Sequence, residues 1–156
     1  NYTGLAGHVV IEDYVILGGQ TGVHQFVRIG AHVMTGGGSK INQDIPPFTI
    51  AQGYPARLRG INHVGLQRRG FTDATIRALR RAYRALFLSD EPRFELALAQ
   101  VRAEFAASHE VGLMLDFIDV ALRCGRGTPR HGARNLNGES GVIETPASLS
   151  EGAAED

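Results

Sequence analysis

The chain has 156 residues, of which 43% are hydrophobic, and its formal net charge at pH 7 is zero. This length allows one ordinary domain or two small ones, and the zero charge gives no overall field that would attract nucleic acid. A membrane-spanning helix needs about 18 apolar residues in a row, and we expect neither such a helix nor a signal peptide. The single Cys124 excludes a disulfide framework and favours a reducing cytoplasm. Because Asn1 rather than methionine comes first, we expect a processed chain or a piece of a longer protein.

A six-residue repeat runs from about Leu5 to Ile41. Its repeat positions are Leu5, Ile11, Leu17, Val23, Ile29, Thr35 and Ile41, and the residues two places earlier are Thr3, Val9, Val15, Thr21, Val27, Val33 and Ser39. The period fits neither an α-helix, which repeats about every 3.6 residues, nor hairpins with turns about every 8–12 residues. It predicts a three-sided solenoid of parallel strands, in which each hexad supplies one inward aliphatic side chain and one corner. Gly18, Gly30 and Gly36 directly follow repeat positions, where they let the backbone turn closely.

The repeat stops at residues 44–47, whose sequence is Asp-Ile-Pro-Pro. Proline has no backbone N–H for a strand ladder. We therefore expect the solenoid, assigned to residues 1–55, to end here or to finish in one irregular coil. The stretch 48–62 contains two glycines and a proline, so it predicts at most one further short strand, and residues 56–71 are assigned to a connector.

From Thr72 onward the hydrophobic period becomes helical, which predicts a small helical bundle over residues 72–124. Thr72 is expected to cap the first helix, residues 89–92 to start the second, and the third to run over about 110–122. The apolar residues at helical spacing are Ile76, Leu79, Tyr83 and Leu86, then Phe94, Leu98, Val101 and Phe105, and finally Val111, Leu115, Ile118 and Leu122. We expect the last set to be buried. Residues 125–156 show no period, so we expect a disordered tail.

Three histidines, His8, His24 and His32, lie outside the inward positions of the repeat. A surface histidine is usually just solvated. However, His24 and Gln25 place a large polar pair where the repeat normally has a small residue, which favours a functional role. The histidines have no metal-ligand spacing and no accompanying cysteine or carboxylate, so we expect no metal site, and there is no nucleophile elbow of a serine hydrolase.

Arg68 and Arg69 lie side by side between the solenoid and the helices. Guanidinium groups suit diphosphates, and a solvated pair is an equally good interpretation. The arginine face of the first helix (Arg77, Arg80, Arg81 and Arg84) is interpreted first as an exposed surface and second as a dock for an acidic carrier protein.

Together these motifs resemble the bacterial UDP-N-acetylglucosamine O-acyltransferases of lipid A biosynthesis, which belong to the hexapeptide-repeat acyltransferases. The segments that carry the resemblance are 5–9, 23–26, 29–34, 46–53 and 65–71, the last reading Gly-Leu-Gln-Arg-Arg-Gly-Phe. The similarity covers roughly residues 1–122 and excludes the tail.

The resemblance implies a β + α fold, a left-handed parallel β-helix followed by a small C-terminal helical bundle, which is an exception to right-handed crossovers. It implies a cytoplasmic homotrimer with active sites between subunits. The implied reaction is transfer of a 3-hydroxyacyl group from acyl carrier protein to the 3-hydroxyl of UDP-N-acetylglucosamine, the first step of lipid A biosynthesis. No cofactor is implied, because the donor is a thioester.

The resemblance also assigns roles to individual residues. Gly7 would give a backbone N–H to the oxyanion, and His8 would contact the acyl or sugar part of the substrate. His24 and Gln25 would hold the sugar-diphosphate, Asn62 would face the uracil, and Arg68 would bind a phosphate. Gly37 with Met34 would set the acyl-chain length. Val64 stands where some members carry an acidic residue. The general-base histidine and a substrate-binding lysine of the family fall before Asn1, so we expect this chain alone to be almost inactive.

Two alternatives stay open from the sequence. The related N-acyltransferase of the third lipid A step is also a trimeric β-helix, although the motif at 65–71 and the helices after it favour the O-acyltransferase. A non-catalytic solenoid that serves as a trimerisation or binding scaffold is the second alternative.

Overall fold

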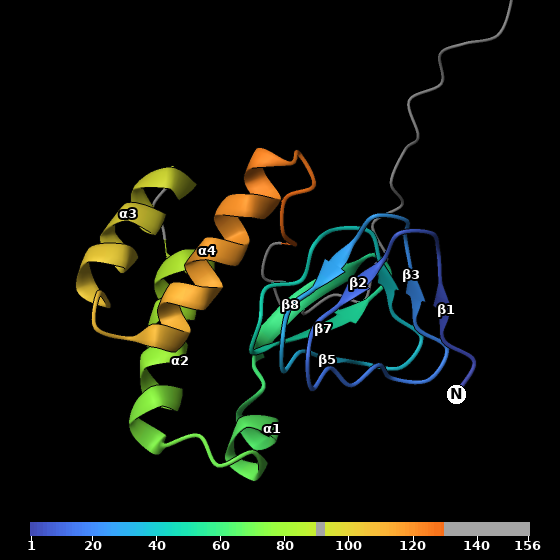
Figure 1. The fold of residues 1–156 in the computed structure, drawn as a ribbon, viewed down its shortest axis with the longest axis horizontal. Coiled ribbons are helices and arrows are strands. Elements are labelled where there is room, and N and C mark those ends of the chain that lie inside the picture. Colours follow the sequence, from blue (N-terminus) through green and yellow to red (C-terminus); the bar gives the residue numbers. More distant parts are fainter. Residues whose placement is uncertain (90–92, 130–156) are drawn as a thin grey trace, which may run out of the picture.

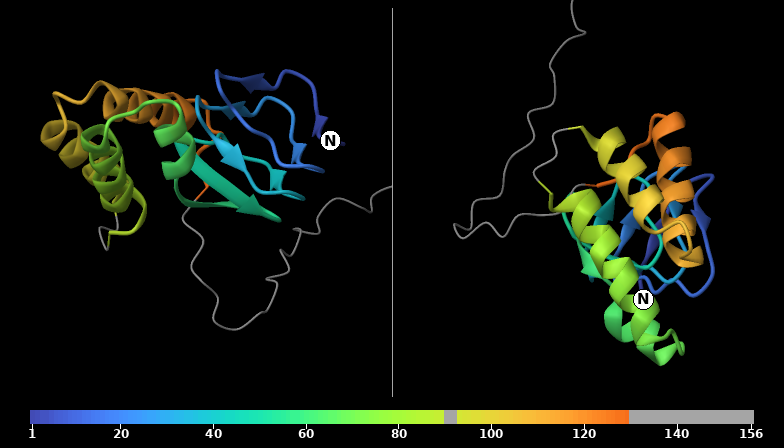
Figure 2. Two further views of the ribbon diagram at one scale, coloured as in Figure 1. Left: turned by 90° about the horizontal axis from the view of Figure 1, so that it is seen from below. Right: turned by 90° about the vertical axis from the view of Figure 1, so that its left-hand side faces the viewer.

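A computed structural model describes residues 1–89 and 93–129 of the chain. A solenoid of short strands lies beside a group of helices (Figure 1), and the helices lie at the end of the solenoid away from the N-terminus (Figure 2). The strands are β1 (Gly4–Leu5), β2 (Val10–Ile11), β3 (Gly22–Val23), β4 (Arg28–Ile29), β5 (Met34–Thr35), β6 (Lys40–Ile41), β7 (Thr49–Gly53) and β8 (Ala56–Ile61). The helices are α1 (His63–Arg68), α2 (Asp73–Phe87), α3 (Phe94–Glu104) and α4 (His109–Arg123).

The strands form one sheet on each side of a three-sided prism, and strands of successive coils pair in parallel, as the six-residue repeat predicts. The strand orders are β1-β3-β6, β2-β4 and β5-β7-β8. Gly4 pairs with Gly22 and Val10 with Arg28, so one coil of the solenoid takes three hexads. The fold is a left-handed parallel β-helix with a small helical part, which confirms the expected fold class.

The inside of the prism is filled by the predicted aliphatic positions from Val23 onward, whereas the predicted inward residues Leu5 and Ile11 are 50% and 38% exposed. Val27, Ile29 and Val33 are almost completely buried. Glycines occur where successive coils nearly touch: a Cβ added to Gly30 would lie 2.5 Å from the nitrogen of Pro47. The sequence therefore needs glycine here for close approach between coils.

Each corner is made by a residue with positive φ, and these residues also recur every six positions. They are Tyr2, His8, Tyr14, Gln20, Phe26 and His32, continued by Gly38 and by Phe48. Because a coil contains three corners, they stack into three columns that we name corner 1 (Tyr2, Gln20, Gly38), corner 2 (His8, Phe26) and corner 3 (Tyr14, His32, Phe48). The left-handed conformation is costly for a residue with a side chain, so each corner depends on the stacked strands that hold it.

The solenoid continues through the Asp-Ile-Pro-Pro break in one irregular coil. Ile29 bridges to Ile45 and Met34 pairs with Ile50, which are offsets of 16 residues in place of 18. The last coil is therefore two residues shorter. Phe48 then shares the buried helical cluster rather than the solenoid core.

The expected connector over 56–71 is largely regular structure. Strand β8 pairs antiparallel with β7, beginning at Ala56 opposite Gly53, so a boundary after residue 55 would cut through a hairpin. Ala56 and Leu58 are buried in the solenoid core, so the hairpin closes the end of the prism. The glycines that suggested a connector fit here because Gly53 and Gly60 have positive φ at the irregular points of the hairpin.

The three predicted helices are present as α2, α3 and α4. Thr72 caps α2 by accepting a hydrogen bond from the Thr75 N–H, whereas the expected start of the second helix at 89–92 falls partly outside the described residues. One buried position was predicted wrongly: Leu122 is 39% exposed, because Ala121 takes the buried place in the last turn of α4. Within the described ranges, no helix combines the length and apolarity that crossing a membrane requires.

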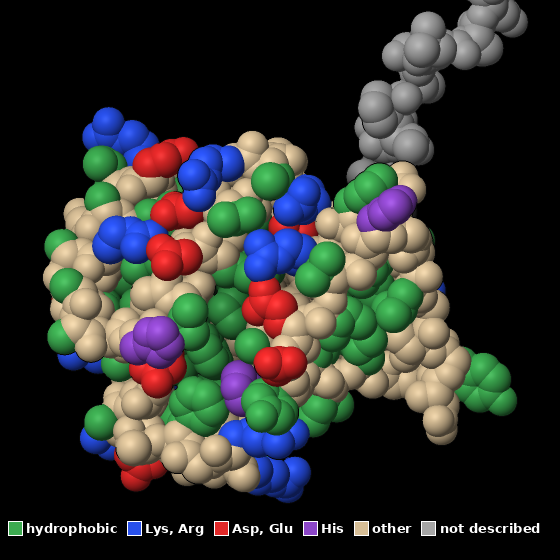
Figure 3. Space-filling model, viewed as in Figure 1, with side chains coloured by type: hydrophobic (Ala, Val, Ile, Leu, Met, Phe, Trp, Pro, Cys, Tyr) green, Lys and Arg blue, Asp and Glu red, His purple; other side chains and the backbone are tan. Residues whose placement is uncertain are grey.

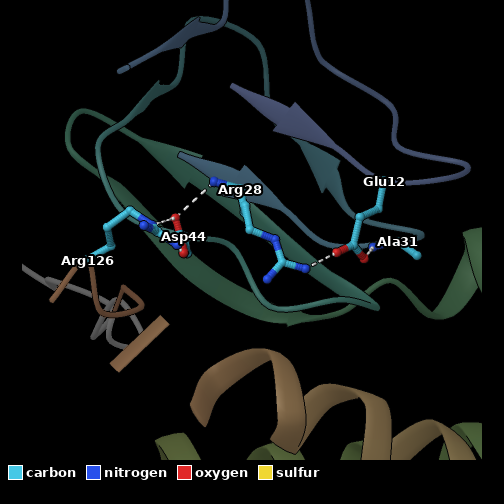
Figure 4. A network of polar contacts seen from close by, with 5 residues as sticks. All are labelled: Glu12, Arg28, Ala31, Asp44 and Arg126. Atoms are coloured by element: carbon cyan, nitrogen blue, oxygen red, sulfur yellow. Dashed lines mark hydrogen bonds and ion pairs between the residues drawn. The ribbon is translucent and has the colours of Figure 1, made fainter. Parts of the chain in front are cut away.

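The segment after α4 is fastened to the solenoid. The Arg126 guanidinium donates to both carboxylate oxygens of Asp44, a side chain that is almost fully buried (Figure 4). The Asp44 N–H donates to the Gly127 carbonyl. The first residues of the predicted tail, up to residue 129, are thus part of the fold, because they supply the partner for a buried carboxylate. The rest of that prediction, 130–156, lies outside the described residues.

We expect Gly30→Ala to lower the free energy of unfolding by about 1–3 kcal/mol, because the new methyl group would collide with the next coil. Gly4→Ala is the matched control, since no atom lies within 4 Å of a Cβ built at Gly4. Its effect should stay within about 0.5 kcal/mol. Urea denaturation followed by circular dichroism measures both, and equal losses would contradict the close contact between coils.

Candidate functional site

Four of the predicted site residues lie together at corner 2. The carbonyl of Gly7 accepts a hydrogen bond from the Phe26 N–H at 3.0 Å, and the His8 ring stacks on the Phe26 ring with centroids 4.9 Å apart. Because the coil repeat is 18 residues, Gln25 lies beside Gly7 in the next coil. Among the described residues no acceptor takes the Gly7 N–H, so this donor is available to a ligand.

The polar pair of His24 and Gln25 stands on the outside of the same corner. The His24 N–H donates to the Ile41 carbonyl at 2.8 Å, which fixes its backbone in the coil ladder. Its ring nitrogen Nδ1 lies 3.3 Å from the Gln25 carbonyl oxygen. Both side chains are exposed, so the pair can contact a bound molecule without any change in the core.

Asn62 lies at corner 3, where it joins α1 to the solenoid. It is only 5% exposed. Its Nδ2 donates to the His32 carbonyl at 2.9 Å, and its Oδ1 accepts from the Gly65 N–H as the N-cap of α1. Its own N–H donates to the Phe48 carbonyl at 2.8 Å. The amide to which the family resemblance assigns a contact with uracil is thus engaged with protein groups in this chain.

The two adjacent arginines at the end of α1 have different surroundings. The Arg69 guanidinium lies over the Tyr14 ring, 4.2 Å from its centroid. Arg68 is exposed at the last position of α1. Arg68 is therefore the arginine with the freedom to reach a phosphate, and Arg69 is held by an aromatic face.

The two residues expected to set acyl length lie at corner 1 and on the adjoining sheet. Gly37 is exposed, and a Cβ added there would lie 3.4 Å from the Gly19 carbonyl oxygen, an ordinary contact. Met34 is 40% exposed on the outer face of its sheet. Ile16 and Ile50 flank it in register, which makes an aliphatic column along that face; hydrophobic side chains also gather over the solenoid half in Figure 3.

The predicted site residues therefore lie at three corners of one chain. Corner 2 collects Gly7, His8, His24 and Gln25; corner 3 holds Asn62 and is close to Arg68; corner 1 holds Gly37. One chain does not bring the three groups together. No cluster of His, Cys, Asp or Glu that could hold a metal ion occurs within the described part of the chain.

Sequence reasoning missed a groove between the solenoid and α4, of about 240 Å³. Arg28 spans it, pairing with Glu12 at 2.5 Å and lying 4.7 Å from the centroid of the Phe117 ring, and the other Glu12 oxygen accepts from the Ala31 N–H (Figure 4). No sequence signal links these residues, because Phe117 is far from them along the chain. The residues that line this groove pack α4 against the solenoid coils.

Sequence reasoning also missed the aromatic column at corner 3. His32 stacks between Tyr14 and Phe48, with centroids 4.8 and 5.7 Å away, and Phe71 meets its edge at 4.9 Å. The signal was present in the sequence, since Tyr14 and His32 occupy the corner position of the repeat, three residues after an inward aliphatic.

The family of the chain follows from a match over the last solenoid coil and the helices. A family model described as UDP N-acetylglucosamine O-acyltransferase, domain 2, matches residues 44–128, more than half of the chain. The chain belongs to the UDP-N-acetylglucosamine O-acyltransferase family. This family is the one that the motifs of the sequence resemble, so that prediction is confirmed.

Relatives and solved structures of this family match the solenoid as well. The acyl-[acyl-carrier-protein]–UDP-N-acetylglucosamine O-acyltransferase of Burkholderia lata is 52% identical over 123 residues, which cover 76% of this chain and 47% of the relative. The structure of the Arabidopsis UDP-N-acetylglucosamine acyltransferase matches with a TM-score of 0.79 and 39% identity, over 83% of this chain and 47% of that chain. The Moraxella catarrhalis UDP-N-acetylglucosamine O-acyltransferase matches with a TM-score of 0.76 and 40% identity, over 83% and 49%. The chain spans about half the length of these relatives.

We expect Asn62→Ala to destabilise the chain more than Thr72→Ala does. Each substitution removes a helix N-cap, which costs about 0.5–2 kcal/mol. Only Asn62→Ala also removes the hydrogen bond that ties α1 to the His32 carbonyl, and it leaves that carbonyl without its partner. Urea denaturation of the two variants measures the difference, and an equal or smaller loss for Asn62→Ala would contradict its role as a joint.

Proposed function

We propose that this chain forms the acceptor-binding half of an acyltransferase that moves a 3-hydroxyacyl group from acyl carrier protein to the 3-hydroxyl of UDP-N-acetylglucosamine, the first step of lipid A biosynthesis. The observation that carries the proposal is the exposed polar cluster of Gly7, His8, His24 and Gln25 at one solenoid corner in a member of this family. The names of its relatives specify this donor and this acceptor.

In the proposed reaction the sugar hydroxyl attacks the thioester carbonyl, and the carrier protein leaves as a thiol. The Gly7 N–H, which has no acceptor among the described residues, donates to the oxygen that becomes negative. A donor aimed at developing charge is the usual source of rate in acyl transfer. His8, in the adjacent position, contacts the acyl or sugar part. The thioester supplies the driving force, so the reaction needs no cofactor or metal, and we place it in the cytoplasm.

The nucleotide sugar spans two chains of a homotrimer in this proposal. His24 and Gln25 of one chain hold the sugar-diphosphate, and Arg68 with the region of Asn62 comes from another. The separation of these residues over different corners supports this arrangement, since one chain does not assemble them. The outward aliphatic column of Ile16, Met34 and Ile50 offers apolar area to a neighbouring chain or to the acyl group, and Met34 with Gly37 sets the acyl length.

We expect Arg68→Ala and Gln25→Ala each to weaken binding of UDP-N-acetylglucosamine by about 10–100-fold, because each removes a hydrogen bond to a charged group. Arg77→Ala is the matched control: it removes an exposed arginine of α2 that is not among the predicted site residues, and it should leave the affinity unchanged. Isothermal titration calorimetry measures the dissociation constants. Equal effects of Arg68→Ala and Arg77→Ala would overturn the phosphate role of Arg68.

The choice of acceptor separates the proposed function from the two alternatives, the N-acyltransferase and the non-catalytic scaffold. UDP-N-acetylglucosamine should bind more tightly than a UDP-3-O-acylglucosamine, whose sugar already carries the acyl group. The reverse order would indicate the N-acyltransferase reaction, and binding of neither would favour a scaffold.

A further inference from the structure

The ring of His32 is the centre of an aromatic column that joins three coils to the helical part. Tyr14 of the first coil and Phe48 of the last coil lie on either side of it, and Phe71, which follows α1, packs against its edge. Phe48 and Phe71 also contact each other, with centroids 6.0 Å apart. Each such aromatic contact adds to the free energy gained from buried area alone.

The same column holds helix α1 at both ends. At the start of α1, the Asn62 side chain donates to the His32 carbonyl and its N–H donates to the Phe48 carbonyl. At the other end, the Arg69 guanidinium lies over the Tyr14 ring. Helix α1 has only six residues, and a helix this short is not stable by itself. Its position therefore depends on corner 3.

The surroundings of His32 favour its neutral form. Burial lowers the pKa of His32 below its ordinary value and the nearby Arg69 lowers it further, while Asp13 acts in the opposite direction. The rings of Tyr14, Phe48 and Phe71 bring no other charge to it. Because the folded chain disfavours the protonated ring, the stability that His32 contributes is present above the pKa of the unfolded chain, about 6.5, and is lost as the pH falls toward the lowered value.

We propose that His32 is a positioning residue for nucleotide binding: its ring holds α1 on corner 3, and thereby places Arg68 where it meets the diphosphate of the nucleotide sugar. This inference rests on the proposed function for its ligand. The hold on α1 itself stands on the ring contacts and on the Asn62 hydrogen bonds.

Two variants separate the ring from its charge. His32→Asn removes the ring and keeps a residue type that tolerates positive φ. His32→Phe keeps an aromatic ring that cannot be protonated, and the fold accepts phenylalanine in this conformation, because Phe26 and Phe48 occupy corners with φ of 65° and 67°. His8→Asn is the matched control for exchange, since it removes a stacked corner histidine from corner 2, away from α1.

Amide hydrogen exchange over residues 66–71 tests the hold on α1. At pH 8 we expect His32→Asn to speed exchange there by about tenfold, relative to intrinsic rates. His32→Phe and His8→Asn should leave it near the wild-type value. Between pH 8 and pH 5.5 the wild-type segment should lose protection and His32→Phe should keep it. Unchanged exchange in His32→Asn, or the same pH response in His32→Phe, would overturn the proposal.

Calorimetric titration with UDP-N-acetylglucosamine at pH 8 tests the positioning. We expect binding to His32→Asn at least threefold weaker than to wild type, with affinity restored in His32→Phe, because without the ring α1 and its arginine must be ordered when the ligand binds. Faster exchange with unchanged affinity would reduce His32 to a structural role and overturn the proposal. A wild-type chain that binds no UDP-N-acetylglucosamine would instead overturn the proposed function and the nucleotide role with it, while the exchange result would still decide whether His32 holds α1.

Discussion

The stacking of 18-residue coils is the constraint on which the rest of the structure depends. Backbone groups of each coil bond to the next coil, so a residue has its counterpart 18 positions later, as Gly4 has in Gly22. This register fixes three things at once: the inward aliphatic positions, the glycines where coils nearly touch, and one left-handed corner per hexad. Side chains at the corners and beside them project outward and do not disturb the solenoid core. Most of the candidate site residues lie at these outward positions.

The last coil is two residues shorter than the others, and this shortening places its residues against the helices. It carries Ile45 into the column of Ile29, and Phe48 enters the helical core from corner 3. In the other direction, Tyr83 of α2 packs into the solenoid core. The buried Asp44 of the shortened coil is matched by Arg126 from beyond α4. The helical part and the solenoid thus share core residues and an ion pair, so α1 and its Arg68 are placed by the same coils that present His24 and Gln25.

Much of this could be predicted from the sequence, because a period of six residues leaves few architectures open. The three-sided solenoid, the capped helix after Thr72 and the buried stripe of α2 all follow from local patterns. The hairpin of β7 and β8 could not be predicted, because its glycines and proline equally suit a connector and only the solenoid core shows that Leu58 is needed inside. The role of Asn62 as a joint was equally hidden. Its partners are the backbone carbonyls of His32 and Phe48, which the stacking of coils brings close to it. Because every residue has a backbone carbonyl, the side-chain types in the sequence do not indicate these contacts.

A crystal structure of this chain with UDP-N-acetylglucosamine tests the central claim most directly: that a nucleotide sugar is bound between chains by residues that one chain keeps apart. The complex should be a trimer with the sugar-diphosphate beside His24 and Gln25 of one chain and the Arg68 guanidinium of a neighbouring chain within hydrogen-bonding distance of a phosphate. A nucleotide sugar bound entirely within one chain, or seated in the groove between Arg28 and Phe117, would contradict the claim.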